Sequence, residues 1–239
     1  TDEFAVLAFR RIPAFRKQIE DRFPGFSRAK VELWSLGQTF DLAASDSDNV
    51  VAIGTGRQLL DEHGKSEAKK TCASEIFGRE VGILLDDEEI LKKDSDERAS
   101  YKAVRLMIEV IKDEDLNSAS AGASIHAMLK KINRLKNPIS LQSIINWCVW
   151  AYVAEYHALK KEIEKSNGRV VSPKVLDIER GKKNIAAYFG ERRANQWVTL
   201  AKKTKEESNA TINQTLDMLI ADKQKAQPKF WSTFDVWKE

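Results

Sequence analysis

The sequence predicts a mainly α-helical protein with two lobes. Only 11 Gly and 5 Pro occur in 239 residues, whereas residues that favour helices are abundant. Along most of the chain, apolar side chains recur at intervals of three and four residues, which is the spacing of one helix face. An apolar content of 42% is sufficient for a sizeable core. These observations argue against the turn-dense pattern of an all-β fold.

The first fifty residues are expected to hold two helices and then a small β element. Apolar residues at helical spacing predict a helix over residues 2–11, and Pro13 either breaks it or opens a second helix to about Arg22. Phe23-Pro24-Gly25 interrupts the pattern. Short apolar pieces between residues 31 and 54, divided by turn-forming residues, predict the β element. Ser27 equally fits the cap of a helix through Leu36.

Three helices are expected between residues 66 and 112. Ser66 is a helix-capping residue, and Gly78 is suited to a helix end. Four acidic residues at 86–89 favour the start of a short helix to Lys93, because carboxylates are stabilised at helix N-termini. A helix over about 96–112 carries one apolar stripe made of Tyr101, Val104, Ile108 and Ile111.

Small residues at 117–124 predict the boundary between an acidic N-terminal lobe, 1–117, and a basic helical lobe, 118–228. In the second lobe, helices are expected at about 125–137, 140–165, 172–190, 191–207 and 212–225. The helix at 140–165 is apolar all round in its middle, which predicts a central position. Pro228 separates residues 229–239 as an aromatic arm.

Charge is divided unevenly along the chain. Residues 1–117 carry 18 Lys or Arg against 24 Asp or Glu, which is a formal charge of −6. Residues 118–239 carry 21 against 12, which is a formal charge of +9. This asymmetry predicts a basic surface that binds a polyanion, while the N-terminal lobe stays acidic.

The basic residues of the second half form clusters between residues 130 and 205. Neutralising phosphates takes several cations on one face and no fixed motif, so we expect nucleic-acid contacts here, with Tyr188 or Trp197 stacking on bases. The alternative is that the basic faces are merely solvated and both aromatic side chains belong to the core. The predicted nucleic-acid-binding residues are Lys130, Lys131, Arg134, Lys136, Arg180, Lys182, Lys183, Tyr188, Arg192, Arg193 and Trp197.

Both ends of the chain carry apolar stripes. Phe230, Phe234 and Trp237 fall at i, i+4 and i+7, with Trp231 beside them. Such a terminal stripe either folds back on its own chain or docks on another copy, and the first helix has the same two choices. We expect a homo-oligomer whose self-assembly residues are Phe4, Leu7, Phe230, Trp231, Phe234 and Trp237.

No motif predicts a reaction. The glycines within Val50–Gly56 resemble a dinucleotide loop, but Leu59 stands at the third glycine position and no βαβ alternation follows. His63, His126 and His157 are far apart and fit no metal-binding frame. We therefore expect that the protein is not an enzyme and that it has no catalytic residue, no metal ligand and no cofactor.

The sequence also predicts a compartment. The apolar start is short, contains two acidic residues and lacks the layout of a secretory signal. The longest apolar run, 144–154, is far shorter than the roughly 20 residues that cross a bilayer. Cys72 and Cys148 are isolated, which is typical of buried reduced thiols. We expect a soluble, cytoplasmic protein that binds no membrane.

Two functions of different classes follow from these features. The first is a nucleic-acid-binding protein, for RNA or single strands, which lacks strong sequence preference and assembles through its terminal arms. A viral nucleocapsid-type protein has the same general plan of size, helicity and basic groove, which is an analogy of plan. The second is a helical adaptor or scaffold that binds another protein through apolar and aromatic surfaces, with the basic excess serving solubility.

Overall fold

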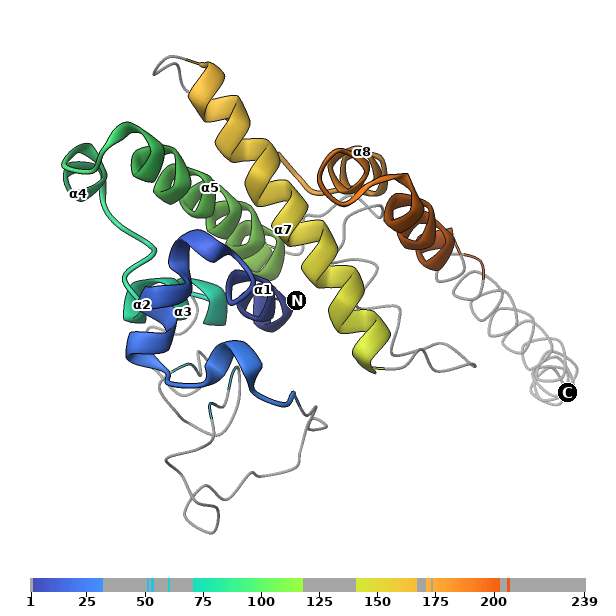
Figure 1. Cartoon of the computed structure of the whole chain (residues 1–239), viewed down its shortest axis with the longest axis horizontal. Coiled ribbons are helices and arrows are strands. Elements are labelled where there is room, and N and C mark those ends of the chain that lie inside the picture. Colours follow the sequence, from blue (N-terminus) through green and yellow to red (C-terminus); the bar gives the residue numbers. More distant parts are fainter. Residues whose placement is uncertain are drawn as a thin grey trace, which may run out of the picture.

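The computed structural model describes residues 2–31, 51, 53, 60, 71–117, 141–166, 171–172, 174–202 and 206. Of these residues, 77% are helical, which confirms the mainly α fold class. Figure 1 shows the helices. The β element expected near 31–54 lies almost entirely outside the described residues, and at its edge Ile53 forms an isolated parallel bridge with Leu60.

The long helix α7 (Leu141–Lys165) is the centre of the fold. It packs against α5 (Ser95–Asn117) and α1 (Asp2–Phe9), and also against α8 (Ile178–Phe189). In Figure 1, α5 and α8 lie on opposite sides of α7, and the helical residues 191–202 follow α8 on its side. Trp147, Cys148 and Ala151 of α7 are almost completely buried. The expected central position of this helix is therefore confirmed.

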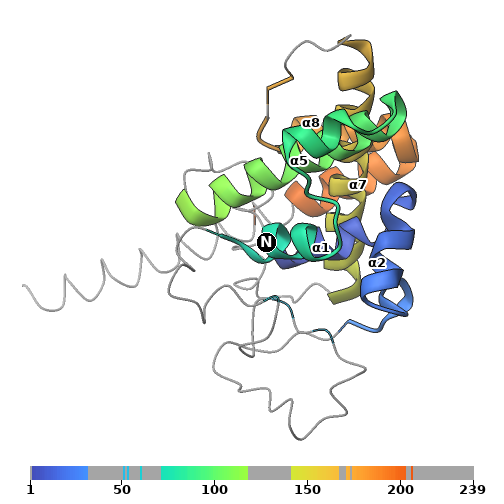
Figure 2. The same cartoon turned by 90° about the vertical axis from the view of Figure 1, so that its left-hand side faces the viewer.

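The N-terminal segment is interrupted where its Pro and Gly residues predict a break. Pro13 opens a short 3-10 helix, η1 (Pro13–Phe15), which leads into α2 (Arg16–Arg22). Gly25 then takes a positive φ of 81°, a conformation that favours glycine, and η2 (Phe26–Arg28) follows. Figure 2 shows α1 beside α7 from the side.

The next helices differ partly from expectation. Helix α3 (Ala73–Glu80) starts after Cys72 and continues beyond Gly78, so Gly78 is not its end. A Cβ at Gly78 would lie 2.9 Å from Ile108 Cδ1, which means that the glycine serves close packing on α5. The turn after α3 instead contains Gly82, at a φ of 69°. Ser66 lies outside the described residues.

The acidic run at 86–89 does start a helix, α4 (Asp87–Leu91). Asp86 accepts a hydrogen bond from the backbone N–H of Glu89, and the Glu89 side chain accepts one from the backbone N–H of Asp86. Helix α5 then covers the predicted range and extends to Asn117. All four residues of its predicted apolar stripe are buried, namely Tyr101, Val104, Ile108 and Ile111.

Helix α8 begins later than its sequence suggests. It does not begin near residue 172 as expected, because its N-cap is Asp177, whose side chain accepts a hydrogen bond from the backbone N–H of Arg180 at 2.8 Å. The helix ends at Phe189, just before Gly190, as predicted. One hydrophobic cluster joins residues of α1, α3, α5, α7, α8 and the helix 191–202. Described helices from both sides of the predicted lobe boundary therefore share one core, and residues 118–124 of that boundary lie outside the described residues.

Candidate nucleic-acid interface

Four of the predicted cations lie exposed on neighbouring helices. Gly181, Asn184 and Ile185 form the buried face of α8, which leaves Lys182 and Lys183 on its solvent side. In the following helix, residues 194, 197 and 201 are buried, whereas Arg192 and Arg193 are exposed. Four other predicted cations, Lys130, Lys131, Arg134 and Lys136, lie outside the described residues, and the ninth, Arg180, is half-buried in α8.

The cations of this region outnumber its acids. Residues 178–202 contain six basic side chains, Arg180, Lys182, Lys183, Arg192, Arg193 and Lys202, against the two acids Glu179 and Glu191. We call Lys182, Lys183, Arg192 and Arg193 the basic face. Among the described residues, none of these four side chains forms an ion pair, and all four are exposed to solvent.

Arg180 has a structural role, which corrects its prediction as a phosphate ligand. Its Nε donates to both carboxylate oxygens of Glu155 at 2.9 Å, and its Nη2 donates to Glu155 Oε1 at 2.6 Å. Asn184 Nδ2 donates to the same carboxylate at 2.6 Å. Burial raises the pKa of Glu155, and the hydrogen bonds from Arg180 and Asn184 oppose that rise. The guanidinium of Arg180 is therefore committed to joining α8 to α7.

Trp197 is also corrected, because it belongs to the core. Its side chain is completely buried and stacks on Trp147 at 5.0 Å between ring centroids. Trp147 Nε1 donates to the backbone carbonyl of Trp197 at 3.1 Å. A ring enclosed in this way has no face on which a base could stack. For Trp197, the alternative considered from the sequence is the right one.

Tyr188 has the opposite environment. Its side chain is 45% exposed, and its ring stacks on His157 of α7 with a centroid distance of 3.8 Å and an interplanar angle of 14°. Phe189 meets the Tyr188 ring edge-on at 4.8 Å. Of the two aromatic residues predicted to stack on bases, Tyr188 is the one that is accessible.

Arg193 extends these ring contacts. Its guanidinium carbon lies 5.2 Å from the Phe189 ring centroid and 5.7 Å from that of Trp150. A row of direct contacts therefore runs from α7 across the two later helices and back to α7. We call it the aromatic row, and its members are, in order, Trp150, Arg193, Phe189, Tyr188 and His157.

Other basic side chains of the second half are engaged with carboxylates. Lys160 Nζ lies 2.6 Å from Asp96 Oδ1, which links α7 to the start of α5. Lys174 Nζ lies 2.8 Å from Glu162 Oε1. Part of the basic excess seen in the sequence is thus paired with carboxylates, whereas the four cations of the basic face are exposed.

The predicted self-assembly residues are only partly described. Leu7 is buried and Phe4 is half-buried in α1, which packs on α7, α3 and α5 of the same chain. Leu7 therefore has partners in its own chain, and its predicted role in self-assembly stays a prediction. The aromatic residues of the arm, Phe230, Trp231, Phe234 and Trp237, lie outside the described residues.

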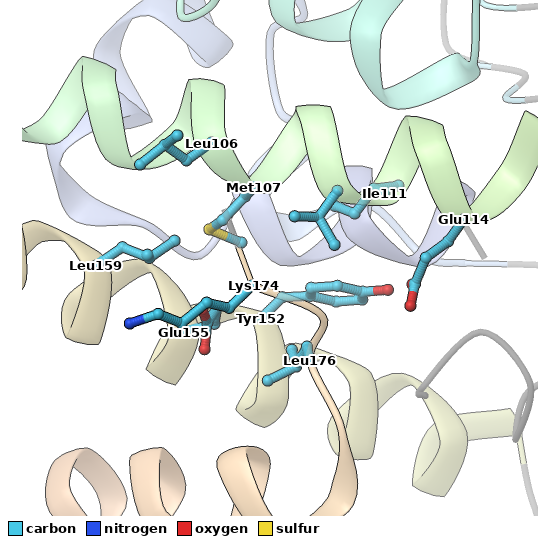
Figure 3. A pocket seen from close by; sticks show the side chains of 10 residues that line it. Leu106, Met107, Ile111, Glu114, Tyr152, Glu155, Leu159, Lys174 and Leu176 are labelled. Atoms are coloured by element: carbon cyan, nitrogen blue, oxygen red, sulfur yellow. The ribbon is translucent and has the colours of Figure 1, made fainter. Parts of the chain in front are cut away.

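A small pocket opens between α5 and α7, and Figure 3 shows it. Its lining is mostly apolar, with Met107, Ile111 and Leu159 among the contributors. In Figure 3 the hydroxyl of Tyr152 is directed toward the carboxylate of Glu114, at one end of the pocket. None of the predicted site residues lines this pocket.

The described residues contain no group of three or more His, Cys, Asp or Glu side chains that could hold a metal ion. Among the same residues, no helix is both long enough and apolar enough to cross a membrane. Cys72 and Cys148 are buried thiols, as predicted, and burial raises the pKa of Cys148.

The sequence did not single out Trp150, His157 or Phe189 as members of the aromatic row. His157 is tested there only against metal-binding frames, and Trp150 lies in the helix that is apolar all round. A usable signal exists, because Trp150 and His157 are seven residues apart and so share one face of α7.

Comparison of the chain with family models, with curated proteins and with solved structures gives no match.

Proposed function

We propose that the protein binds nucleic acid, RNA or single strands, without strong sequence preference, through the basic face. The observation that carries the proposal is the grouping of Lys182, Lys183, Arg192 and Arg193 on two consecutive helices, all exposed and without a recorded ion pair among the described residues. Phosphate neutralisation accounts for most sequence-independent affinity, and it requires such a group of solvent-directed cations.

Two further observations support this proposal. The formal charge of +9 on residues 118–239 adds attraction at longer range. The accessible ring of Tyr188 lies on the same helix as Lys182 and Lys183. Self-assembly through residues 229–239 remains part of the proposal, and the aromatic stripe in the sequence is its support.

The adaptor alternative has less support. The large apolar side chains that are exposed in the described residues come from four separate segments, and they are Leu91, Leu116, Val175 and Tyr188. Exposed apolar residues that occur singly are normal for any protein surface.

Charge reversal tests the basic face. In the double variant Lys182→Glu/Lys183→Glu, affinity for a labelled single-stranded RNA should fall at least about tenfold at low salt, because two phosphate contacts become repulsive. The slope of log affinity against log salt should also decrease by about two. Fluorescence anisotropy titrations over a range of salt concentrations measure both quantities.

The matched control is Lys17→Glu/Lys92→Glu, which changes the net charge equally at exposed lysines of α2 and of the segment after α4. Equal losses in the two double variants would show a general charge effect and would contradict the proposed face. Absence of wild-type binding at about 50 mM salt would favour the adaptor alternative.

A further inference from the structure

The exposure of Tyr188 is unusual for its surroundings. Its neighbours in the aromatic row, Phe189 and His157, are partly covered, whereas Tyr188 keeps 45% of its surface accessible. His157 covers one face of the ring by stacking at 3.8 Å. Phe189 also contacts the ring, with a centroid distance of 4.8 Å, and the exposed fraction comes from the rest of the side chain. An aromatic side chain that is held by stacking and keeps nearly half of its surface accessible is suited to accept a second flat ring.

His157 holds the Tyr188 ring in place. The two rings are nearly parallel, and His157 is a residue of α7 whose ring also contacts that of its neighbour Tyr156 edge-on at 4.9 Å. His157 Nε2 is buried without a hydrogen-bond partner among the described residues, so the imidazole contributes its ring surface rather than a polar contact at that atom. Burial, together with the charge of Lys160, lowers the pKa of His157, which favours the neutral ring.

Arg193 supplies a cation at the other end of the row. Its guanidinium lies over the rings of Phe189 and Trp150. Guanidinium groups that pack on aromatic faces keep their N–H donors available at the edges, where they match phosphate oxygens. The row therefore combines an open ring at Tyr188 with a positioned phosphate donor.

We propose that Tyr188 stacks a base of single-stranded nucleic acid, with His157 as the positioning residue and Arg193 as a contact of a neighbouring phosphate. This inference rests on the proposed function and adds the kind of substrate that the face prefers. In a duplex both faces of each base are covered by neighbouring bases, whereas a single strand can present a base to the ring. Single strands should therefore bind more tightly than duplexes of equal charge.

An abasic strand, which keeps the phosphates and lacks the bases, distinguishes the contribution of base stacking to affinity from the contribution of charge. The wild-type chain should bind a short single-stranded oligonucleotide more tightly than an abasic strand of equal length. Tyr188→Ala should weaken binding of the oligonucleotide by about tenfold to a hundredfold and leave binding of the abasic strand unchanged. Tyr188→Trp should restore the preference, and its fluorescence should be quenched by the oligonucleotide alone.

The role of His157 is tested in the same assay. His157→Ala should lower the ratio of oligonucleotide to abasic affinity, and His157→Phe should restore the ratio because it returns a ring to stack on Tyr188. Leu91→Ala is the control, since Leu91 is 61% exposed on α4 and belongs to no part of the row. Circular dichroism verifies that each variant is folded.

The outcomes distinguish the two proposals. If the wild-type chain binds both strands equally and Tyr188→Ala has no selective effect, base stacking is overturned while nucleic-acid binding stands. If neither strand binds at low salt, the proposed function fails and the stacking site fails with it. A selective loss for the base-bearing strand, restored by Tyr188→Trp, supports stacking.

Discussion

At the residue scale, buried carboxylates are the most demanding features of the protein. Glu155 and Glu75 are both nearly inaccessible, and each is held by cationic partners from other helical turns. Glu155 is joined to Arg180 and Asn184 of α8, and Glu75 is joined to Lys112 of α5 and to Arg79. A buried carboxylate that loses its partner retains the cost of leaving water.

Removal of the Arg180 side chain should therefore destabilise the fold. Arg180→Ala is expected to reduce the free energy of unfolding by about 3–5 kcal/mol, because it leaves the Glu155 carboxylate buried with Asn184 alone. The control is Arg22→Ala, which breaks the exposed pair with Glu80 and should cost no more than about 1 kcal/mol. Urea denaturation measures both, and a similar small cost for the two variants would contradict the structural role of Arg180.

The environment of Glu75 predicts that the stability of the fold depends on pH. Burial raises the pKa of this carboxyl, but hydrogen bonds from Lys112, Arg79 and Thr71 outweigh burial, so the pKa lies below its usual value. A depressed pKa means that the ionised carboxylate stabilises the fold above the unfolded pKa, and that this contribution is lost as the pH falls through the folded pKa.

The variant Glu75→Gln should therefore be less stable than the wild type at pH 7, and the two should converge in acid. Thermal unfolding followed by circular dichroism at pH 7 and at about pH 3 provides the comparison. A difference in melting temperature that is independent of pH would show that Glu75 acts through packing alone.

At the scale of elements, helix identity followed from the sequence better than helix boundaries. Periodicity located α5 and α7, because their buried stripes are long and regular. It misplaced the start of α8, since the Ser172-Pro173 signal is local and takes no account of Asp177, whose side chain caps the helix. Periodicity also could not show which of Trp197 and Tyr188 is buried, because both lie among basic residues. Only the packing of α7 against its neighbours decides which ring is buried.

Gly181 shows why two elements can approach so closely. A Cβ at this position would lie 2.4 Å from Trp197 Cη2 and 2.8 Å from Cζ2. Because that ring is enclosed and stacked on Trp147, it has little room to move. Gly181→Ala should lower the free energy of unfolding by about 1–3 kcal/mol through overpacking, despite the better helix propensity of alanine.

The measurement is urea denaturation, with Gly25→Ala as a comparison. Gly25 has no neighbour within 4 Å of an added Cβ, so any cost there comes from its positive φ and not from a clash. A further Trp197→Phe change should relieve much of the penalty at Gly181 if the clash is its cause, and it should not affect the penalty at Gly25. Additive losses in the Gly181 double variant would contradict the clash.

At the scale of the whole molecule, the charge asymmetry of the sequence located the basic half of the chain, but it did not show which of its cations are exposed. Arg180, Lys160 and Lys174 are each paired with a carboxylate. Their partners are 12 to 64 residues away in the chain. The fold class was predictable because composition and periodicity are averaged over the chain. The aromatic row was not, because it joins three helices through single side chains.

The stacked indoles of Trp147 and Trp197 have an optical consequence. Two chromophores with a centroid separation of 5.0 Å should couple their strong electronic transitions, so we expect this pair to contribute an exciton signal to the circular dichroism of the native chain. That contribution depends on the helical residues 191–202 resting against α7, and their detachment should remove it while leaving the helical content almost intact. The pair would thus serve as a label-free reporter of whether this helix is docked.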